Sequence, residues 1–366
     1  MKIICKQETL LNNINIALKA ITGRSTQAVL KCLLLDALKN FKIFATDLKL
    51  SIETKPIECE ITQGGRIAVD ARMFSDIIKR LPNENVSIYV DDQYSMTITC
   101  GKTEFNISGF DASEFPTFPE VNKTPLLKIG GDVLSEMISK TIFATSTNDL
   151  KPIFKGELFE VENNIFNLVA LDGYRVAHKK INLENITENR KIVIPGKDLS
   201  EISRLIEKEE DVTIYADNQH AIFDISTATI ITRLLDGAFL EYNSLFSIEV
   251  TTELILKKSE IVASLERALL LSREGKINSV KFDIQSGILK ISSISESGNI
   301  KEELEVQQTG EDIVLGFNPR YLIEIFKIID NDEIKVTFSS SASPCIIAGI
   351  GETQSRYIVL PLRLRK

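Results

Sequence analysis

The feature that most constrains the fold of this chain is one apolar pattern that occurs three times. Residues 74–81 place apolar side chains at helical spacing, and residues 86–90 then alternate as they would on a strand. The same order begins again at Leu199, 125 residues after Phe74, and at Leu322, 123 residues further on. The alternative is coincidence among common patterns, and three copies at nearly equal spacing argue against it.

Each copy is preceded by a second helical stripe and by segments that alternate like strands. The stripes lie at residues 10–21, 133–142 and 261–269, and the strand-like segments include residues 42–45, 166–170 and 280–284. Helices that are apolar on one side have to lie on a sheet, and alternating strands indicate an antiparallel sheet with one solvated face. The predicted fold class is therefore α+β, with three tandem domains that each combine helices and antiparallel sheet.

The length agrees with three domains of this kind. The chain has 366 residues, which is too long for one ordinary hydrophobic core. A Pro-rich, polar stretch near residues 116–125 and a second break near residues 246–252 indicate linkers. We expect domains at residues 1–120, 126–246 and 247–366.

The composition is typical of a globular protein, with 43% hydrophobic and 26% charged residues. No apolar run approaches the ~18 residues of a membrane span, and the N-terminus has no signal-peptide pattern, so a cytoplasmic location is expected. A net charge of −8 would argue against DNA as a partner if the whole surface were acidic. The expected helical segments together carry no net charge, however, so the rest of the chain accounts for the acidic excess.

Motifs for metal binding and catalysis are missing. The five cysteines are scattered, and His178 and His220 have no partners at metal-ligand spacing, so no metal or other cofactor is predicted. The segment Gly101-Lys102-Thr103 resembles the end of a P-loop, but Met96 occupies the position of the required glycine. Its flanks alternate like strands and predict a hairpin turn. An enzyme with dispersed active-site residues remains an alternative.

Several short motifs, in order along the whole chain, resemble the bacterial sliding clamp family, the beta subunit of DNA polymerase III. They are residues 22–26 (TGRST), 33–35 (LLL), 46–48 (TDL), 110–116 (FDASEFP), 171–177 (LDGYRVA), 234–237 (LLDG), 316–318 (GFN) and 357–364 (YIVLPLRL). Each motif is weak alone, and their order and spacing make the resemblance specific. It implies the DNA clamp fold, in which two protomers join head to tail into a ring with helices lining the hole.

The function implied by this resemblance is processivity in DNA replication, without catalytic activity of its own. The implied partners are duplex DNA, bound without sequence preference, a second copy of the chain, the polymerase III catalytic subunit, the clamp loader, and other polymerases or repair proteins. A monomeric repeat scaffold that binds only proteins is the alternative.

A ring of this kind needs only loose contacts between channel cations and backbone phosphates. The candidate DNA-binding residues lie on or beside the expected helices: Arg24, Arg72, Lys79, Arg80, Lys197 and Arg204. Arg24 stands where the family carries a DNA-facing arginine. Ordinary solvated surface charge is the alternative for all of them.

The resemblance also implies two protein-binding surfaces. At the protomer contact, Phe105 and Ile107 would meet Leu270 and Leu271 of the second copy, and core packing is the alternative for both pairs. The acidic Glu302, Glu303 and Glu305 could face Lys102, Arg72 or Lys79 there. A cleft for short linear peptides would be formed by Phe154, Leu171, Gly173, Tyr174, Arg175, Val176, Leu240, Leu245, Ile358, Val359, Leu360, Pro361, Leu362 and Arg363.

The expected cleft departs from the family pattern at several positions. Phe154 replaces a leucine, Leu240 a proline and Ser244 a common arginine, while Leu360 and Leu362 replace methionines. Arg365 and Lys366 extend past the usual end of the chain. We expect an altered peptide preference rather than lost binding. Val176 and Val359 could equally be core residues.

Overall fold

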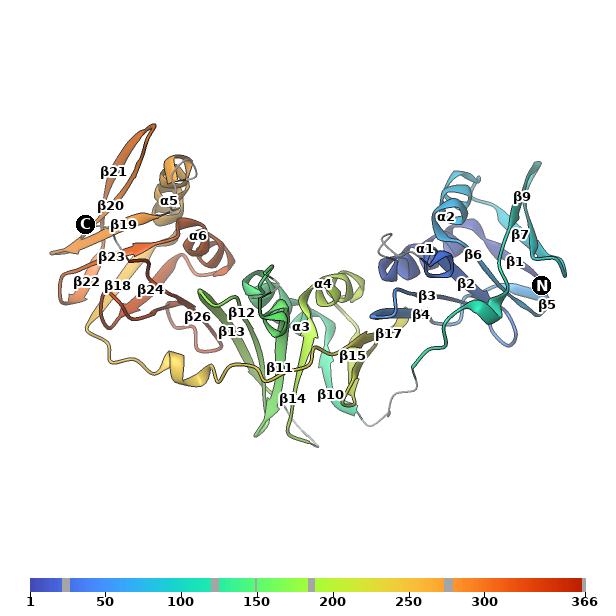
Figure 1. The fold of residues 1–366 in the computed structure, drawn as a ribbon, viewed down its shortest axis with the longest axis horizontal. Coiled ribbons are helices and arrows are strands. Elements are labelled where there is room, and N and C mark those ends of the chain that lie inside the picture. The colour runs from blue at the N-terminus through green and yellow to red at the C-terminus, as the bar shows by residue number, and fades with distance from the viewer. Residues whose placement is uncertain (22–26, 120–124, 149, 184–187, 273–278, 364–366) are drawn as a thin grey trace. The chain divides into compact units, whose positions relative to one another are not determined.

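The structure, a computed structural model, describes residues 1–21, 27–119, 125–148, 150–183, 188–272 and 279–363. The chain divides into two compact units, whose helices and strands are labelled in Figure 1. Unit 1 comprises Met1–Ser135 and Lys197–Leu234, and unit 2 comprises Glu136–Gly196 and Leu235–Lys366. Each unit is built from antiparallel sheets with helices packed on them.

Unit 1 holds two sheets. The five-stranded sheet has the order β5 (Glu60–Gln63), β1 (Lys2–Lys6), β7 (Asn85–Val90), β8 (Ser95–Cys100) and β9 (Thr103–Ser108). The eight-stranded sheet has the order β10 (Pro125–Gly130), β15 (Asp211–Ala216), β16 (His220–Asp224), β17 (Ala228–Arg233), β4 (Leu50–Thr54), β3 (Lys42–Thr46), β2 (Cys32–Asp36) and β6 (Arg66–Asp70). Because β17 pairs with β4, this sheet joins strands of the first and second repeats.

Unit 2 repeats this arrangement with the later strands. Its nine-stranded sheet has the order β14 (Arg190–Pro195), β11 (Gly156–Glu162), β12 (Ile165–Leu171), β13 (Arg175–Asn182), β26 (Ser355–Val359), β25 (Cys345–Gly349), β24 (Glu333–Phe338), β18 (Thr252–Lys257) and β22 (Gln307–Gly310). Its four-stranded sheet has the order β21 (Gly298–Glu305), β20 (Ile288–Ser295), β19 (Val280–Gln285) and β23 (Ile313–Phe317). The pairing of β13 with β26 joins the second and third repeats.

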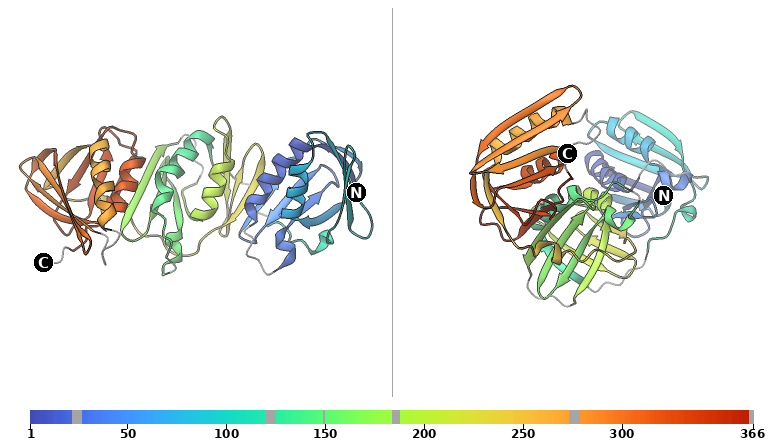
Figure 2. Two further views of the ribbon diagram at one scale, coloured as in Figure 1. Left: turned by 90° about the horizontal axis from the view of Figure 1, so that it is seen from above. Right: turned by 60° about the vertical axis from the view of Figure 1, so that its left-hand side comes forward.

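The helices lie on the sheets as their one-sided patterns require. They are α1 (Gln7–Ala17), α2 (Ala71–Arg80), α3 (Gly131–Thr141), α4 (Gly196–Leu205), α5 (Lys258–Ser272) and α6 (Pro319–Ile328). In unit 1, α1 and α2 lie side by side over the strands (Figure 2). Asp70 caps α2 by accepting a hydrogen bond from the Met73 amide at 2.8 Å, and the helix buries Phe74, Ile77 and Ile78.

The core of unit 2 shows how burial fixes these helices. Leu265 of α5 and Phe326 of α6 are almost completely buried in one cluster with side chains of β18–β20 and β24–β26. Asn318 caps α6 through the Arg320 amide, and Pro319 occupies its first turn. Full burial of a large apolar side chain contributes about 1.5–3 kcal/mol, so these helices are stabilised mainly by packing.

The expected antiparallel α+β organisation is confirmed, and so are the main expected elements. The strand-like segments 42–45, 166–170 and 280–284 lie in β3, β12 and β19, and residues 101–102 form the turn of the β8–β9 hairpin. The five cysteines are unpaired thiols. Among the described residues, no helix is both long enough and apolar enough to span a bilayer. The same residues contain no cluster of His, Cys, Asp and Glu suited to a metal ion.

Candidate functional site: an apolar pocket at the β13–β26 junction

An apolar pocket lies in unit 2 where β13 pairs with β26. Its cavity is about 130 Å³, a size that suits side chains rather than a cofactor. The lining residues are Leu171, Gly173, Tyr174, Arg175, Val176, Leu240, Leu245, Pro344, Ile358 and Leu360. Aliphatic side chains dominate this lining, so the pocket is suited to an apolar anchor from a peptide.

A tight turn between β12 and β13 presents Tyr174 at the rim of the pocket. The Asp172 carboxylate accepts hydrogen bonds from the amides of Tyr174, at 2.8 Å, and Arg175, at 3.0 Å. Gly173 has φ +94°, which a side chain would strain even though no atom lies within 4 Å of the position a Cβ would occupy. The turn leaves Tyr174 56% exposed, and its ring stacks on Tyr321 of α6 at 6.2 Å.

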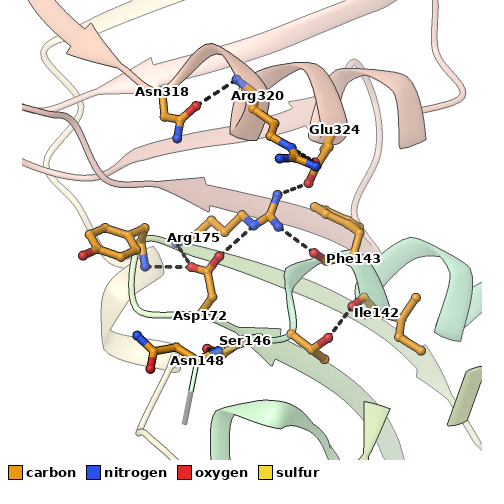
Figure 3. Close-up of polar contacts among 11 residues, drawn as sticks. Ile142, Phe143, Ser146, Asn148, Asp172, Arg175, Asn318, Arg320 and Glu324 are labelled. Atoms are coloured by element: carbon orange, nitrogen blue, oxygen red, sulfur yellow. Dashed lines mark hydrogen bonds and ion pairs between the residues drawn. The ribbon is translucent and has the colours of Figure 1, made fainter. Parts of the chain in front are cut away.

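Arg175 ties this turn to the neighbouring elements (Figure 3). Its guanidinium donates to Asp172 Oδ2 at 3.0 Å, to the Phe143 carbonyl at 2.7 Å and to the Glu324 carboxylate of α6. The group also lies over the rings of Phe143, at 5.2 Å, and Tyr321, at 4.6 Å. Because Arg175 is only 8% exposed, these carboxylates and rings replace its hydration. Arg175 therefore braces the wall of the pocket.

The structure brings together nine of the fourteen residues predicted for the cleft. Phe154 does not line the pocket, but it packs in the apolar cluster that includes the lining residues Leu171 and Val176. Its ring lies edge-on to that of Phe239, with the ring centres 6.1 Å apart. Val359 is fully buried in the core that contains α5 and α6, in agreement with the core alternative. Two residues after Leu360, the Leu362 amide donates to the Gly316 carbonyl of β23 at 2.7 Å, and Leu362 does not line the pocket. Pro361 is half-buried, and Arg363 is exposed.

Sequence reasoning missed Pro344, which lines the pocket just before β25. It belongs to none of the family motifs, and only the fold brings it beside Leu360. Glu324 and Phe143, which hold Arg175, were also missed. Helical spacing placed Glu324 on a helix but could not indicate its partner.

The candidate DNA-binding residues that the structure describes are exposed on two helices. Arg72, Lys79 and Arg80 project from α2, and Lys197 and Arg204 from α4. Arg204 donates to Glu201 at 2.8 Å, and Glu201 also pairs with Lys19 at 3.5 Å. Arg24 lies outside the described residues, as do Arg365 and Lys366.

The candidate protomer-contact residues lie at sheet edges and at a helix end. Phe105 and Ile107 are on β9, an outer strand of the five-stranded sheet, and Phe105 is 37% exposed. Leu270 and Leu271 are in the last turn of α5, and Leu270 is 67% exposed. Both Phe105 and Leu270 are therefore more exposed than ordinary core residues.

Two of the three acidic residues expected at the protomer contact, Glu302 and Glu303, have partners within their own chain. Glu302 of β21 accepts two hydrogen bonds from Arg267, at 2.6 and 2.5 Å, and Glu303 pairs with Lys290 at 3.4 Å. The pairing with Arg267 lowers the pKa of Glu302. These bonds orient Glu302 before any second copy is present.

Three repeats of helix and antiparallel sheet, joined by strand pairing across two junctions, define a DNA clamp fold. Models of the DNA polymerase III beta subunit match the chain as its N-terminal domain over residues 1–119, its central domain over residues 128–241 and its C-terminal domain over residues 243–363. The chain therefore belongs to the family of bacterial DNA polymerase III beta subunits, the beta sliding clamps.

Full-length relatives agree with this assignment. A beta sliding clamp of Staphylococcus aureus is 32% identical over 99% of both chains. The solved DNA polymerase sliding clamp of Bacillus subtilis is 32% identical, covers 100% of both chains and superposes with a TM-score of 0.95. A sliding clamp from Pseudomonas aeruginosa, solved bound to griselimycin, is 25% identical over 100% of both chains with a TM-score of 0.93.

Proposed function

We propose that this protein is a DNA sliding clamp, in which two copies form a ring around duplex DNA and tether a polymerase during replication. The observation that carries the proposal is the family match over all three domains, together with near-complete structural similarity to solved clamps. A closed ring stays on circular DNA by topology, so it needs no tight DNA contact. Action in replication implies the cytoplasm. The protein would act as a processivity factor without catalysis of its own.

The channel contacts would come from exposed cations on the helices. Arg72, Lys79 and Arg80 on α2, with Lys197 and Arg204 on α4, are long and exposed, so they can reach phosphates without a fixed geometry. Arg24 is included by its place in the sequence. Contacts to phosphates carry no sequence information, which suits a protein that slides.

Ring closure would use the outer strands and the apolar residues beside them. β9, with Phe105 and Ile107, would pair with the second copy's edge near Leu270 and Leu271. Unpaired strand edges bind other edges readily, and the exposed Phe105 and Leu270 would supply apolar contact area. The ion pairs at the rim would contribute little to affinity.

The pocket at the β13–β26 junction would bind short peptides from the polymerase III catalytic subunit, the clamp loader and other polymerases or repair proteins. The apolar lining supports one or two apolar anchors, and the exposed Tyr174 can cover a bound side chain. Affinity of order micromolar, or about −8 kcal/mol, would let these partners exchange. Phe154 and Leu240 would alter the preference among peptides.

The experiment that tests the ring is retention on DNA. The protein is loaded on nicked circular DNA, the circle is cut, and the bound fraction is measured before and after cutting. A ring is lost when the DNA becomes linear, whereas equal retention on both forms would reject encirclement. The Leu270→Glu variant places a charge at the proposed contact, so it should lose retention while still binding peptide. A monomeric protein scaffold would show no difference between this variant and the wild type.

A further inference from the structure

Part of the pocket lining comes from a connector rather than from a strand. The connector between β17 and β18 comprises residues 234–251, and its Leu240 and Leu245 line the pocket. Leu240 is 46% exposed, so its own burial contributes little to holding it in place. Something else has to fix the connector if the pocket is to keep its shape.

Tyr242 anchors the connector two residues after Leu240. It is 2% exposed, and its hydroxyl donates to Glu160 Oε2 on β11. The second oxygen of Glu160 pairs with Lys191 Nζ at 2.7 Å, so the buried carboxylate stays compensated. Burial and the bond to Glu160 raise the pKa of Tyr242, which keeps the hydroxyl protonated as the donor.

Phe246 anchors the connector one residue after Leu245. The guanidinium of Arg356, on β26, lies 3.9 Å from the centre of the Phe246 ring. Arg356 Nε also donates to His178 Nδ1 at 3.0 Å, and the other ring nitrogen of His178 lies 2.9 Å from Asn167 Oδ1. Since Nδ1 accepts a bond, the proton of His178 belongs on Nε2, which donates to Asn167.

His178 joins the two anchors into one assembly. Its ring centre lies 5.2 Å from that of Tyr242 and 5.7 Å from that of Phe246. Burial, followed by the charges of Arg356 and Lys180, lowers the pKa of His178 to about 3. The ring therefore stays neutral at physiological pH and continues to accept from Arg356.

We propose that Tyr242, Glu160, His178 and Arg356 are positioning residues that hold the connector so that Leu240 and Leu245 shape the peptide pocket. None of these four lines the pocket, and together they form a latch between the sheet and the connector. This inference rests on the proposed peptide binding. It predicts that peptide affinity depends on polar contacts that the peptide never touches.

The test compares two changes that each remove one buried tyrosine hydroxyl from unit 2. Tyr242→Phe removes the hydrogen bond from Tyr242 to Glu160. Tyr357→Phe removes a hydroxyl in the core that contains α5 and α6, and it serves as the matched control. The probe is a fluorescein-labelled short peptide ending in leucine and phenylalanine, titrated by anisotropy. We expect Tyr242→Phe to weaken binding about fivefold, because the loosened connector must be ordered on binding. Tyr357→Phe should leave the affinity unchanged.

A conservative pair tests the same bond from the other side. Glu160→Gln keeps an oxygen that can accept from Tyr242 and should bind the peptide nearly as the wild type does. Glu160→Leu removes the acceptor and should reproduce the loss seen with Tyr242→Phe. Equal affinity of all these variants would overturn the proposal.

Hydrogen exchange at the amides of residues 243–247 separates this inference from the proposed function. Exchange should accelerate in Tyr242→Phe and stay unchanged in Tyr357→Phe, with or without peptide. If the wild type fails to bind any peptide, the proposed function fails, and unchanged exchange in Tyr242→Phe would refute the latch independently. Faster exchange with unchanged peptide affinity would refute the positioning role.

Discussion

Arg175 shows how one buried charge can organise the edge of a pocket. Its guanidinium is shared between Asp172 of its own turn and Glu324 of α6, while two aromatic rings cover its faces. Removing the guanidinium would leave Asp172, whose side chain is only 12% exposed, buried without its partner. The turn that presents Tyr174 should therefore depend on Arg175 more than on any exposed charge nearby.

We expect Arg175→Gln to lower the free energy of unfolding by about 3 kcal/mol, measured by urea denaturation. Arg320→Gln is the matched control, because Arg320 pairs with the same Glu324 at 3.1 Å while its side chain is 73% exposed. An exposed pair of that kind contributes about 0–1 kcal/mol. Similar losses in the two variants would contradict the bracing role of Arg175.

Glu157 places a carboxyl group in the interior on β11, where it accepts a hydrogen bond from the Thr141 hydroxyl at 3.2 Å. Burial raises the pKa of Glu157 well above its ordinary value of 4.5. The unfolded chain therefore releases this proton above pH 4.5 while the folded protein retains it. Stability from this group is complete below pH 4.5 and falls as the pH rises through the folded pKa.

Glu157→Gln should remove this fall, since glutamine is neutral at every pH. We expect urea unfolding across a pH series to show that the free energy of unfolding of the variant increases relative to that of the wild type. The increase should be about 1.4 kcal/mol per pH unit above pH 4.5, until the folded carboxyl also ionises. Glu162→Gln is the control, because Glu162 lies exposed at the end of the same strand. A parallel pH profile for wild type and Glu157→Gln would show that Glu157 is ionised in the folded protein.

At the scale of elements, the β4–β17 junction and the β13–β26 junction have the same kind of turn but are lined by different side chains. Asp47 accepts from the amides of Lys49, at 3.0 Å, and Leu50, at 2.8 Å, as Asp172 does at the other junction. Counting from these aspartates, Thr46 and Ser51 stand where Leu171 and Val176 line the pocket. Their hydroxyls are 2.7 Å apart and bonded to each other, so this position is polar.

Peptide binding should therefore occur once per protomer. Isothermal titration with a short apolar peptide should give a stoichiometry of one per protomer, because the buried hydroxyl pair at the β4–β17 junction offers no favourable contact to an apolar anchor.

Tyr174→Ala should abolish most of this peptide binding, while Leu362→Ala, which changes a residue paired with β23, should not. A stoichiometry of two would show that the β4–β17 junction also binds.

At the scale of the whole molecule, DNA affinity should depend on several weak phosphate contacts. Replacing Arg72, Lys79 and Arg80 together by alanine should make DNA binding less sensitive to salt. The slope of log K against log salt should become shallower by about 0.9 for each phosphate that is no longer neutralised. Replacing Lys128, Lys257 and Lys335, which lie on strands, is the charge-matched control. An equal effect of both triple variants would indicate nonspecific charge rather than a channel.

Whether the sequence predicted a structural feature correctly depends on how far apart in the chain the interacting residues lie. The helices and strands were predictable because their apolar periodicity reflects local burial, as Phe74, Ile77 and Ile78 on α2 illustrate. The lining of the pocket was predicted only in part: Val359 and Leu362 belong to the same segment as Leu360 but have different surroundings. When both faces of a strand are covered, the alternation of its side chains does not indicate which element packs on each face.

The sequence by itself determined the three repeats, the α+β class and the turn motif LDGYRVA, because each rests on contacts between residues close in the chain. Only the tertiary structure decided that β13 pairs with β26, that Pro344 completes the pocket and that Tyr242 is anchored on Glu160. The physical reason is separation along the chain. Tyr242 and Glu160 are 82 residues apart in the chain, and a local sequence pattern does not indicate a partner at that distance.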